Sequence, residues 1–164
     1  MTVDIEVRLA TITDAPVLAR HRAEMFRDMG ELRDDQYDTI RTAAERDIAA
    51  WLASGDYVSW VATPAGRPGE IVAGAGLQIR KLLPRPLPDG QGIRQGPEAI
   101  VLNVFTERPW RRRGIAARLM EQVIAWARPH GIAGSCCTPR PKDAGCTSDS
   151  ASSRRTRCVT RVSW

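Results

Sequence analysis

The stretch whose residue types can do chemistry runs from Arg111 to Ala116 and reads Arg-Arg-Arg-Gly-Ile-Ala. It follows an apolar, β-branched run at 99–106, which predicts a buried strand, and it precedes a run with helical periodicity. A helix that begins here leaves several backbone N–H groups without partners at the positive end of its dipole. Such a helix start attracts a phosphate, and Gly114 lets the backbone approach it with no Cβ in the way.

An ordinary strand–turn–helix with a basic start is the alternative interpretation of the same residues. It is less favourable physically, because positive side chains oppose the helix dipole at this end unless an anion compensates them. The pattern therefore predicts an anion site in the turn.

The elements around this turn must position it. A possible cap at Thr13 or Asp14 begins a helix, on which His21 is interpreted as a packed side chain rather than a ligand. Gly74 and Gly76 inside a strand indicate a bulge or a close backbone approach. The expected elements are a strand at 3–10, helices from about 14 and at 34–52, a hairpin of strands at 57–63 and 71–82, a Pro- and Gly-rich loop at 83–97, a strand at 99–106 and a helix to about 128.

Length and charge limit the function classes. A chain of 164 residues usually forms one domain. It has no apolar run of about 20 residues and no signal-peptide pattern, so no membrane partner and a cytoplasmic location are expected. The formal net charge is +5, and residues after Ala133 account for four of these charges. The nearly neutral remainder argues against a nucleic-acid partner.

The turn and its flanks resemble the GCN5-related N-acetyltransferase (GNAT) family. Arg111, Gly114 and Ala116 fit the spacing Arg/Gln-x-x-Gly-x-Gly/Ala. The resemblance covers about residues 3–132 and implies an α/β (α+β) fold with a mixed, mostly antiparallel sheet flanked by helices. The further matching positions, where that family's central strand, loop and helix have similar residues, are Leu102-Asn103-Val104-Phe105, Trp110, Arg111 to Ala117 and Leu119-Met120.

The resemblance implies transfer of an acetyl group from acetyl-coenzyme A, as cosubstrate and without a metal, directly to a primary amine. The pantetheine arm would pair with the strand like an added strand, and the pyrophosphate would bind the amides of 112–117. The implied cofactor-binding residues are Val104, Phe105, Thr106, Arg111, Arg112, Arg113, Gly114, Ile115, Ala116 and Ala117.

The amine must lose a proton before it attacks the thioester, which requires a base or an ordered water. The strand has no carboxylate in its middle, but Glu98 and Glu107 flank it and Asn103 could position a water. Asn103 and Glu98 are therefore the candidate catalytic residues. By resemblance, the thiolate's proton donor is commonly a tyrosine from a later segment, whereas Tyr37 and Tyr57 occupy no matching position.

The sequence changes character after residue 132, so we predict an acetyl-coenzyme A-binding domain at 1–132 and an atypical, partly ordered tail at 133–164. The tail is rich in Ser, Thr, Arg and Cys and lacks the family's last strands, its tyrosine and its Leu-Gly-Phe turn. No Cys-x-x-Cys pair exists, so no metal site is expected, and disulfides are unusual in the cytosol. The four cysteines are Cys136, Cys137, Cys146 and Cys158.

A single-base frame change near Ala133 is our hypothesis for this tail. In the shifted frame, cysteine codons give Leu, Val or Met, and with a free choice of the unspecified bases the segment can read RVVLHASAEGRRLYERLGFVATNEMRY. That string resembles the family's C-terminal third, including its LY and LGF elements. If the printed tail is the polypeptide, we expect short strands within 132–138 and 159–164, with the rest loosely ordered and able to exchange contacts in a homodimer.

Two other functions remain open from the sequence: a coenzyme A-binding regulatory module without turnover, and an arginine-rich nucleic-acid-binding protein. Steep weakening of binding with salt would distinguish the nucleic-acid binder. The acceptor also stays open among small amines, antibiotics, peptide N-termini and lysines.

Overall fold

The computed structural model describes residues 4–87, 89–136 and 160–161, and these residues form one sheet with helices on both faces. The strand order is β1-β2-β3-β4-β5-β6, and every neighbouring pair is antiparallel except β4 and β5. This confirms the expected mixed, mostly antiparallel class. The elements are β1 (Ile5–Leu9), α1 (Ala15–Asp28), α2 (Tyr37–Ser54), β2 (Tyr57–Pro64), β3 (Ala73–Pro86), β4 (Ile93–Thr106), α3 (Ile115–Ala127), β5 (Ala133–Cys136) and β6 (Thr160–Arg161).

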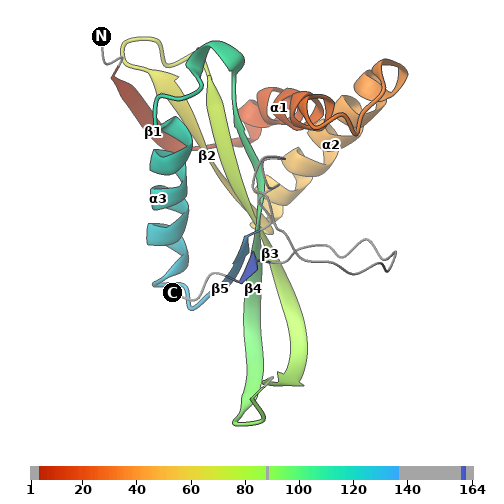
Figure 1. The fold of residues 1–164 in the computed structure, drawn as a ribbon, viewed down its shortest axis with the longest axis vertical. Helices are drawn as coiled ribbons and strands as arrows, with labels where there is room; N and C mark the ends of the chain where they lie inside the picture. Colours follow the sequence, from red (N-terminus) through yellow and green to blue (C-terminus); the bar gives the residue numbers. More distant parts are fainter. Residues whose placement is uncertain (1–3, 88, 137–159, 162–164) are drawn as a thin grey trace, which may run out of the picture.

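The helices cover opposite faces of the sheet, with α3 on one side and α1 and α2 on the other (Figure 1). Side chains of β2 alternate between the two cores, as the period of a strand requires. Trp60 and Ala62 pack in the cluster with α3, whereas Tyr57 and Val61 pack in the cluster with α1 and α2. Both faces of the central strands are therefore buried. No helix of the described residues has the length and apolar character needed to cross a bilayer.

A β-bulge interrupts β4 in the middle of the sheet. Gly74 pairs with Phe105 and Gly76 with Leu102, so Asn103 and Val104 together stand opposite Ala75. Asn103 has φ 56°, in the left-handed region, which asparagine tolerates better than most residues. The bulge lies where the sequence predicted it, although the extra residue is on the partner strand of the two glycines.

The bulge also coincides with the end of the pairing between β4 and β5. That parallel ladder runs from Glu98 to Val101 on β4 and is not recorded beyond it. From the bulge to Thr106, β4 therefore has β3 on one side and no strand partner on the other among the described residues.

Gly76 marks the close approach that the sequence predicted. A Cβ built on it would lie 1.9 Å from the hydroxyl oxygen of Tyr57, a side chain that is only 2% exposed. We expect Gly76→Ala to lower the free energy of unfolding by roughly 2–4 kcal/mol, because the tyrosine must move and lose its hydrogen bond. Chemical denaturation measures this. Gly69→Ala, where a Cβ meets no atom within 4 Å, is the matched control, and equal stability of the two variants would contradict this packing.

The prediction of a loop at 83–97 is wrong over most of that range. β3 continues to Pro86 and β4 begins at Ile93, so the two strands form a ribbon that projects beyond the body (Figure 1). Counting the described residues alone, each strand of this ribbon has a neighbour on one side only, except where β5 begins to pair at Glu98. Prolines are tolerated there, because a missing N–H can face the unpaired side.

Part of the predicted tail belongs to the sheet. β5 confirms the short strand expected within 132–138, and β6 lies within the segment expected to form another. The remaining predictions for the tail, including those on Cys137, Cys146 and Cys158, fall on residues 137–159 and 162–164, outside the described residues.

Candidate functional site

The turn before α3 is shaped by two left-handed residues. Arg112 has φ 61°, and Gly114, the residue that precedes the first turn of α3, has φ 74°. The buried stripe of Ile115, Leu119 and Val123 then holds the helix against the sheet, as its periodicity predicted. Among the described residues, the backbone N–H groups of 112–117 have no hydrogen-bond acceptor. This row of free donors lies at the positive end of the helix dipole.

A cavity of about 350 Å³ lies between this turn and the open edge of β4, and we call it the donor groove. Nine of the ten residues expected to bind the cofactor line it, together with Trp110, which was not on that list. Arg113 is the exception, and its guanidinium lies over the ring of Trp110 at 5.1 Å from the centroid. The lining residues are Val104, Phe105, Thr106, Trp110, Arg111, Arg112, Gly114, Ile115, Ala116 and Ala117.

Arg111 fixes the turn to α1. Its Nε donates to the carbonyl oxygen of Thr106 at 2.8 Å, and its guanidinium binds Asp28. The other carboxylate oxygen of Asp28 accepts from Arg108 at 2.6 Å. Hydrogen bonds from Arg108 and then Arg111 hold the pKa of Asp28 below its usual value, so the carboxylate stays charged at neutral pH. Arg111 thus shapes the groove, while Arg112 has no carboxylate partner in the described part of the chain.

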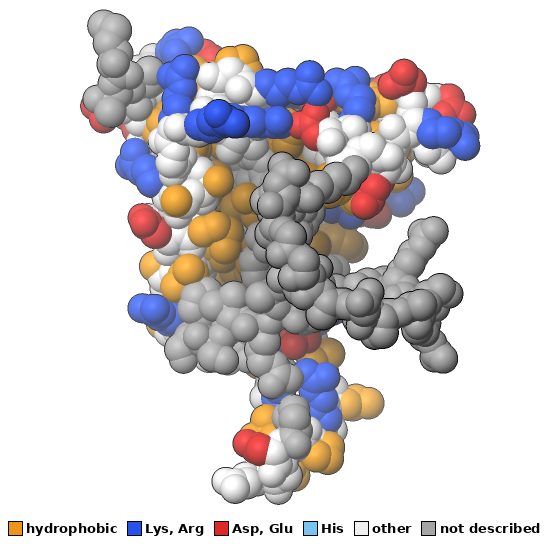
Figure 2. Space-filling view, viewed as in Figure 1, with side chains coloured by type: hydrophobic (Ala, Val, Ile, Leu, Met, Phe, Trp, Pro, Cys, Tyr) orange, Lys and Arg blue, Asp and Glu red, His pale blue; other side chains and the backbone are white. Residues whose placement is uncertain are grey.

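Basic side chains gather along one edge of the molecule. Figure 2 shows Lys and Arg side chains along the upper edge of the view, over the turn that leads into α3, with hydrophobic side chains below them beside that helix. A polar, positive end and an apolar flank suit a ligand that carries phosphates at one end and a less polar arm at the other.

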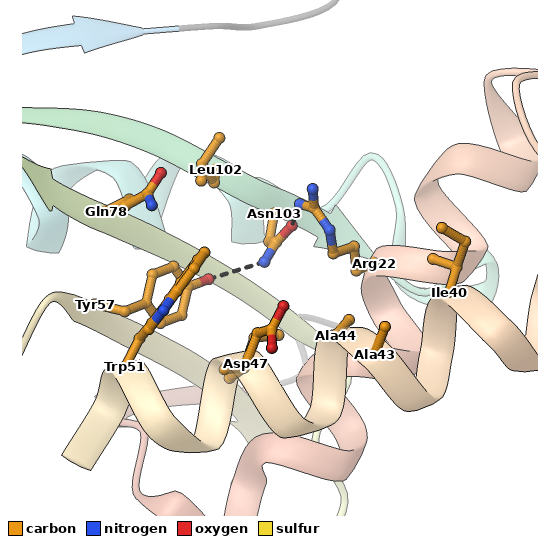
Figure 3. A pocket seen from close by; sticks show the side chains of 11 residues that line it. Arg22, Ile40, Ala43, Ala44, Asp47, Trp51, Tyr57, Gln78, Leu102 and Asn103 are labelled. Carbon is orange, nitrogen blue, oxygen red and sulfur yellow. Dashed lines mark hydrogen bonds between the residues drawn. The ribbon is translucent and has the colours of Figure 1, made fainter. Parts of the chain in front are cut away.

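A second cavity, of about 230 Å³, lies between α1, α2 and the sheet, and we call it the α1–α2 cavity (Figure 3). Polar groups converge at its inner end. Asn103 Nδ2 donates to the hydroxyl of Tyr57 at 3.0 Å, and Arg22 Nη1 donates to Asn103 Oδ1 at 2.5 Å. Burial raises the pKa of Tyr57, so its hydroxyl remains protonated at neutral pH. The side chain of Asn103 is therefore held at both its oxygen and its nitrogen.

The lining of one cavity gives way to the lining of the other at the bulge of β4, which we call the junction of the cavities. Leu102 and Asn103 line the α1–α2 cavity, and the next three residues, Val104, Phe105 and Thr106, line the donor groove. Asn103 and Val104, the two residues of the bulge, thus line one cavity each.

His21 supports the strand beneath the groove. Its side chain is 1% exposed and its ring centroid lies 5.0 Å from that of Phe105. Burial, the largest cause, lowers the pKa of His21 to about 4, so the ring is neutral at pH 7 although Nε2 lies 3.4 Å from Oε1 of Glu107. The interpretation of His21 as a packed side chain is confirmed.

Glu98 lies apart from Asn103. Asn103 comes five positions after Glu98 along an extended strand, so their Cα atoms are about 17 Å apart. Its carboxylate faces three arginines of the β3–β4 ribbon, at 3.2 Å from Arg94, 3.7 Å from Arg85 and 4.0 Å from Arg80. The structure therefore brings Asn103 to the junction of the cavities and leaves Glu98 in the ribbon.

Sequence reasoning did not identify Arg22, Asp28 or Tyr57 as parts of the site. Asn103 is 46 residues from Tyr57 and 81 from Arg22 along the chain, so no local pattern signals their contact. Among the described residues, no group of three or more His, Cys, Asp or Glu side chains is arranged to hold a metal ion.

Similarity to known proteins agrees with this architecture. The model of the Acetyltransferase (GNAT) family matches residues 26–142. A GCN5-related N-acetyltransferase from Ralstonia eutropha JMP134 is 24% identical with a TM-score of 0.69, covering 89% of this chain and 99% of its own. A predicted acetyltransferase with acetyl-CoA from Clostridium acetobutylicum is 19% identical with a TM-score of 0.65, covering 92% and 96%.

A third solved structure is more distant. The ribosomal-protein-alanine N-acetyltransferase from Brucella melitensis biovar Abortus 2308 is 16% identical with a TM-score of 0.56, covering 93% of this chain and 99% of its own. No curated protein sequence matches significantly. These structural likenesses concern the fold, whereas the family model spans well over half of the chain and includes the bulged strand, the turn and α3. The chain therefore belongs to the GNAT family of acetyltransferases, whose typical cosubstrate is acetyl-coenzyme A.

Proposed function

We propose that this chain transfers the acetyl group of acetyl-coenzyme A directly to the nitrogen of an amine held in the α1–α2 cavity. The observation that carries the proposal is that consecutive residues of β4 line the two cavities. One cavity offers phosphate-binding amides, and the other offers a fixed carboxamide next to an apolar wall. The family match and the similar fold of a protein solved with acetyl-CoA support the assignment.

The donor groove is the proposed cofactor site. The amides of 112–117 would bind the pyrophosphate, since they point from a helix start and have no acceptor among the described residues. The open edge of β4 from Val104 to Thr106 would pair with the amide groups of the pantetheine arm, as an added strand pairs with a sheet edge. The thioester would then lie at the bulge.

Transfer requires the amine to attack the thioester carbon in its neutral form. The N–C bond forms as the C–S bond breaks, the amine proton passes to water, and the departing thiolate of coenzyme A takes up a proton. We assign Asn103 to orient the amine or the water that accepts its proton. Glu98 is not part of this proposal, because its carboxylate faces three arginines away from the junction.

Acetyl-coenzyme A should stabilise the protein. A ligand that binds only the folded state at a hundred times its Kd adds about 2.7 kcal/mol, which raises the Tm of a domain of this size by roughly 5–10 °C. Differential scanning fluorimetry with a series of acetyl-coenzyme A concentrations measures the shift, and adenosine without phosphates is the control. No shift at millimolar acetyl-coenzyme A would refute the proposal, as would salt-sensitive binding to nucleic acid without binding of the cofactor.

A further inference from the structure

We infer that the acceptor is an α-amino carboxylate, a free amino acid with an apolar side chain, whose carboxylate binds Arg22 while its amine faces Asn103. This inference rests on the proposed function, because it names the acceptor class of the same site. Three features of the α1–α2 cavity carry it: the unpaired charge of Arg22, the short distance between Arg22 and Asn103, and the apolar wall of α2.

Arg22 differs from its neighbours on α1 in having no counter-ion. Arg20 binds Glu107 at 2.5 Å and Arg27 binds Glu24 at 2.5 Å, whereas no carboxylate of the described residues pairs with Arg22. Within the part of the chain that the structure describes, its guanidinium contacts the amide oxygen of Asn103 and the face of the Phe26 ring, at 4.9 Å from the centroid.

A cation with no carboxylate of the described residues within ion-pair distance is costly in this position. Burial lowers the pKa of Arg22, yet a guanidinium remains protonated at neutral pH, so a positive charge stays in a partly apolar cavity. A carboxylate of the ligand would supply the missing partner and can accept two parallel hydrogen bonds from the planar guanidinium. The cavity thus has a ready site for an anion on its α1 side.

The spacing selects an α-amino acid among anionic amines. The reacting amine must lie at the bulge, beside Asn103, to reach a thioester in the donor groove. Arg22 Nη1 is itself only 2.5 Å from Asn103 Oδ1, so the anion and the amine of the acceptor must be close neighbours. One carbon separates the two groups in an α-amino acid, whereas the longer chain of an ω-amino acid would keep them several ångströms apart when extended.

The remaining walls describe the side chain of the acceptor. Ile40, Ala43, Ala44 and Trp51 of α2 line the cavity, and Figure 3 shows them along this one helix. Asp47 lies on the same helix and lines the same cavity, with its carboxylate held by Arg46 at 2.9 Å. Its negative charge would attract the ammonium form of an arriving amine and repel a second carboxylate. Apolar amino acids therefore fit better than aspartate or glutamate.

The test is calorimetric titration of the full chain, with and without coenzyme A, using L-leucine, L-methionine and L-phenylalanine as probes. Isopentylamine and L-leucinamide keep the amine of leucine but lack its carboxylate, and 4-methylpentanoate keeps the carboxylate but lacks the amine. We expect at least one of the three amino acids to bind roughly tenfold or more tightly than these analogues, which lack either the carboxylate or the amine. A charge-assisted hydrogen bond contributes on that scale.

Arg22→Gln should abolish that preference, and Arg22→Lys should restore it in part, because lysine returns the charge without the planar geometry. Arg27→Gln, on the same helix but outside the cavity, should leave it unchanged. Melting curves show whether each variant folds. If Arg22→Gln does not fold, the comparison of Arg22→Lys with the unmodified chain still tests the inference.

Equal binding of leucine and isopentylamine would overturn the inference, as would an Arg22→Gln variant that keeps the full preference. The same holds if none of the three amino acids binds while acetyl-coenzyme A does. Failure of acetyl-coenzyme A to bind would instead refute the proposed function, because the titrations of the α1–α2 cavity without cofactor do not depend on it.

Discussion

Gly114→Val is expected to abolish the thermal stabilisation by acetyl-coenzyme A while the protein still folds. A Cβ on Gly114 meets no protein atom within 4 Å, and Gly114 lines the donor groove. The added side chain would therefore project into open space at the groove. The branched side chain would occupy the place proposed for the pyrophosphate and would strain a residue with φ 74°. Scanning fluorimetry of the variant with and without millimolar acetyl-coenzyme A measures the effect, and we expect a shift of less than about 1 °C.

Gly90→Val is the matched control for this variant. Gly90 also has a left-handed φ, of 69°, and a Cβ there also meets no atom within 4 Å, but it lies at the tip of the β3–β4 ribbon. Both valine variants suffer similar backbone strain, roughly 1–3 kcal/mol, so the loss of binding should be specific to Gly114. A Gly114→Val protein that responds to acetyl-coenzyme A as the unmodified chain does would place the pyrophosphate elsewhere.

Restoring the family-like reading frame after Ala133 should increase turnover by about 10²–10⁴-fold, the range typical of a positioned general acid or base. The printed tail lacks the tyrosine that the resemblance implies as proton donor to the thiolate, whereas the shifted frame can encode one in its LY element. Acetyl-coenzyme A binding should change little, because the donor groove consists of residues 104–117. Release of free thiol, measured with a panel of amines at equal folded fraction, gives the comparison.

Sequencing of the gene and the intact mass of the protein accompany this comparison, since they establish which tail the cell makes. Equal turnover of the two proteins would show that the proton donor lies within residues 1–133. The functional part of the frame-change hypothesis would then be wrong.

The donor groove could be predicted from the sequence because its parts are local. A strand, a turn with Gly114 and a helix with a buried stripe occupy 99–127, so their periodicity and the family spacing identify nine of the ten lining residues. The α1–α2 cavity could not be predicted in this way. Its polar cluster joins Arg22, Tyr57 and Asn103 from three elements, and only the folded sheet brings them together.

The β3–β4 ribbon was missed for a different reason. Proline and glycine in 83–97 predict a loop when each residue is taken alone. How strongly they destabilise a strand, however, depends on whether the side without hydrogen bonds faces a neighbouring strand. That information lies in the order of the strands, which local composition does not contain. Glu98 was a candidate base for a similar reason. The three arginines around it come from both strands of the ribbon, and local composition does not show that they surround it.

Helix α1 contacts residues of both cavities. Arg22 reaches the polar cluster of the α1–α2 cavity, and Asp28, six residues later, holds Arg108 and Arg111 of the turn that shapes the donor groove. Six residues of helix span about 9 Å along the helix axis. A tilt of α1 that widens the α1–α2 cavity would also strain the ion pairs between Asp28 and the turn before α3. If both proposed ligands bind, thermodynamic linkage requires that any effect of one on the affinity for the other be equal in both directions.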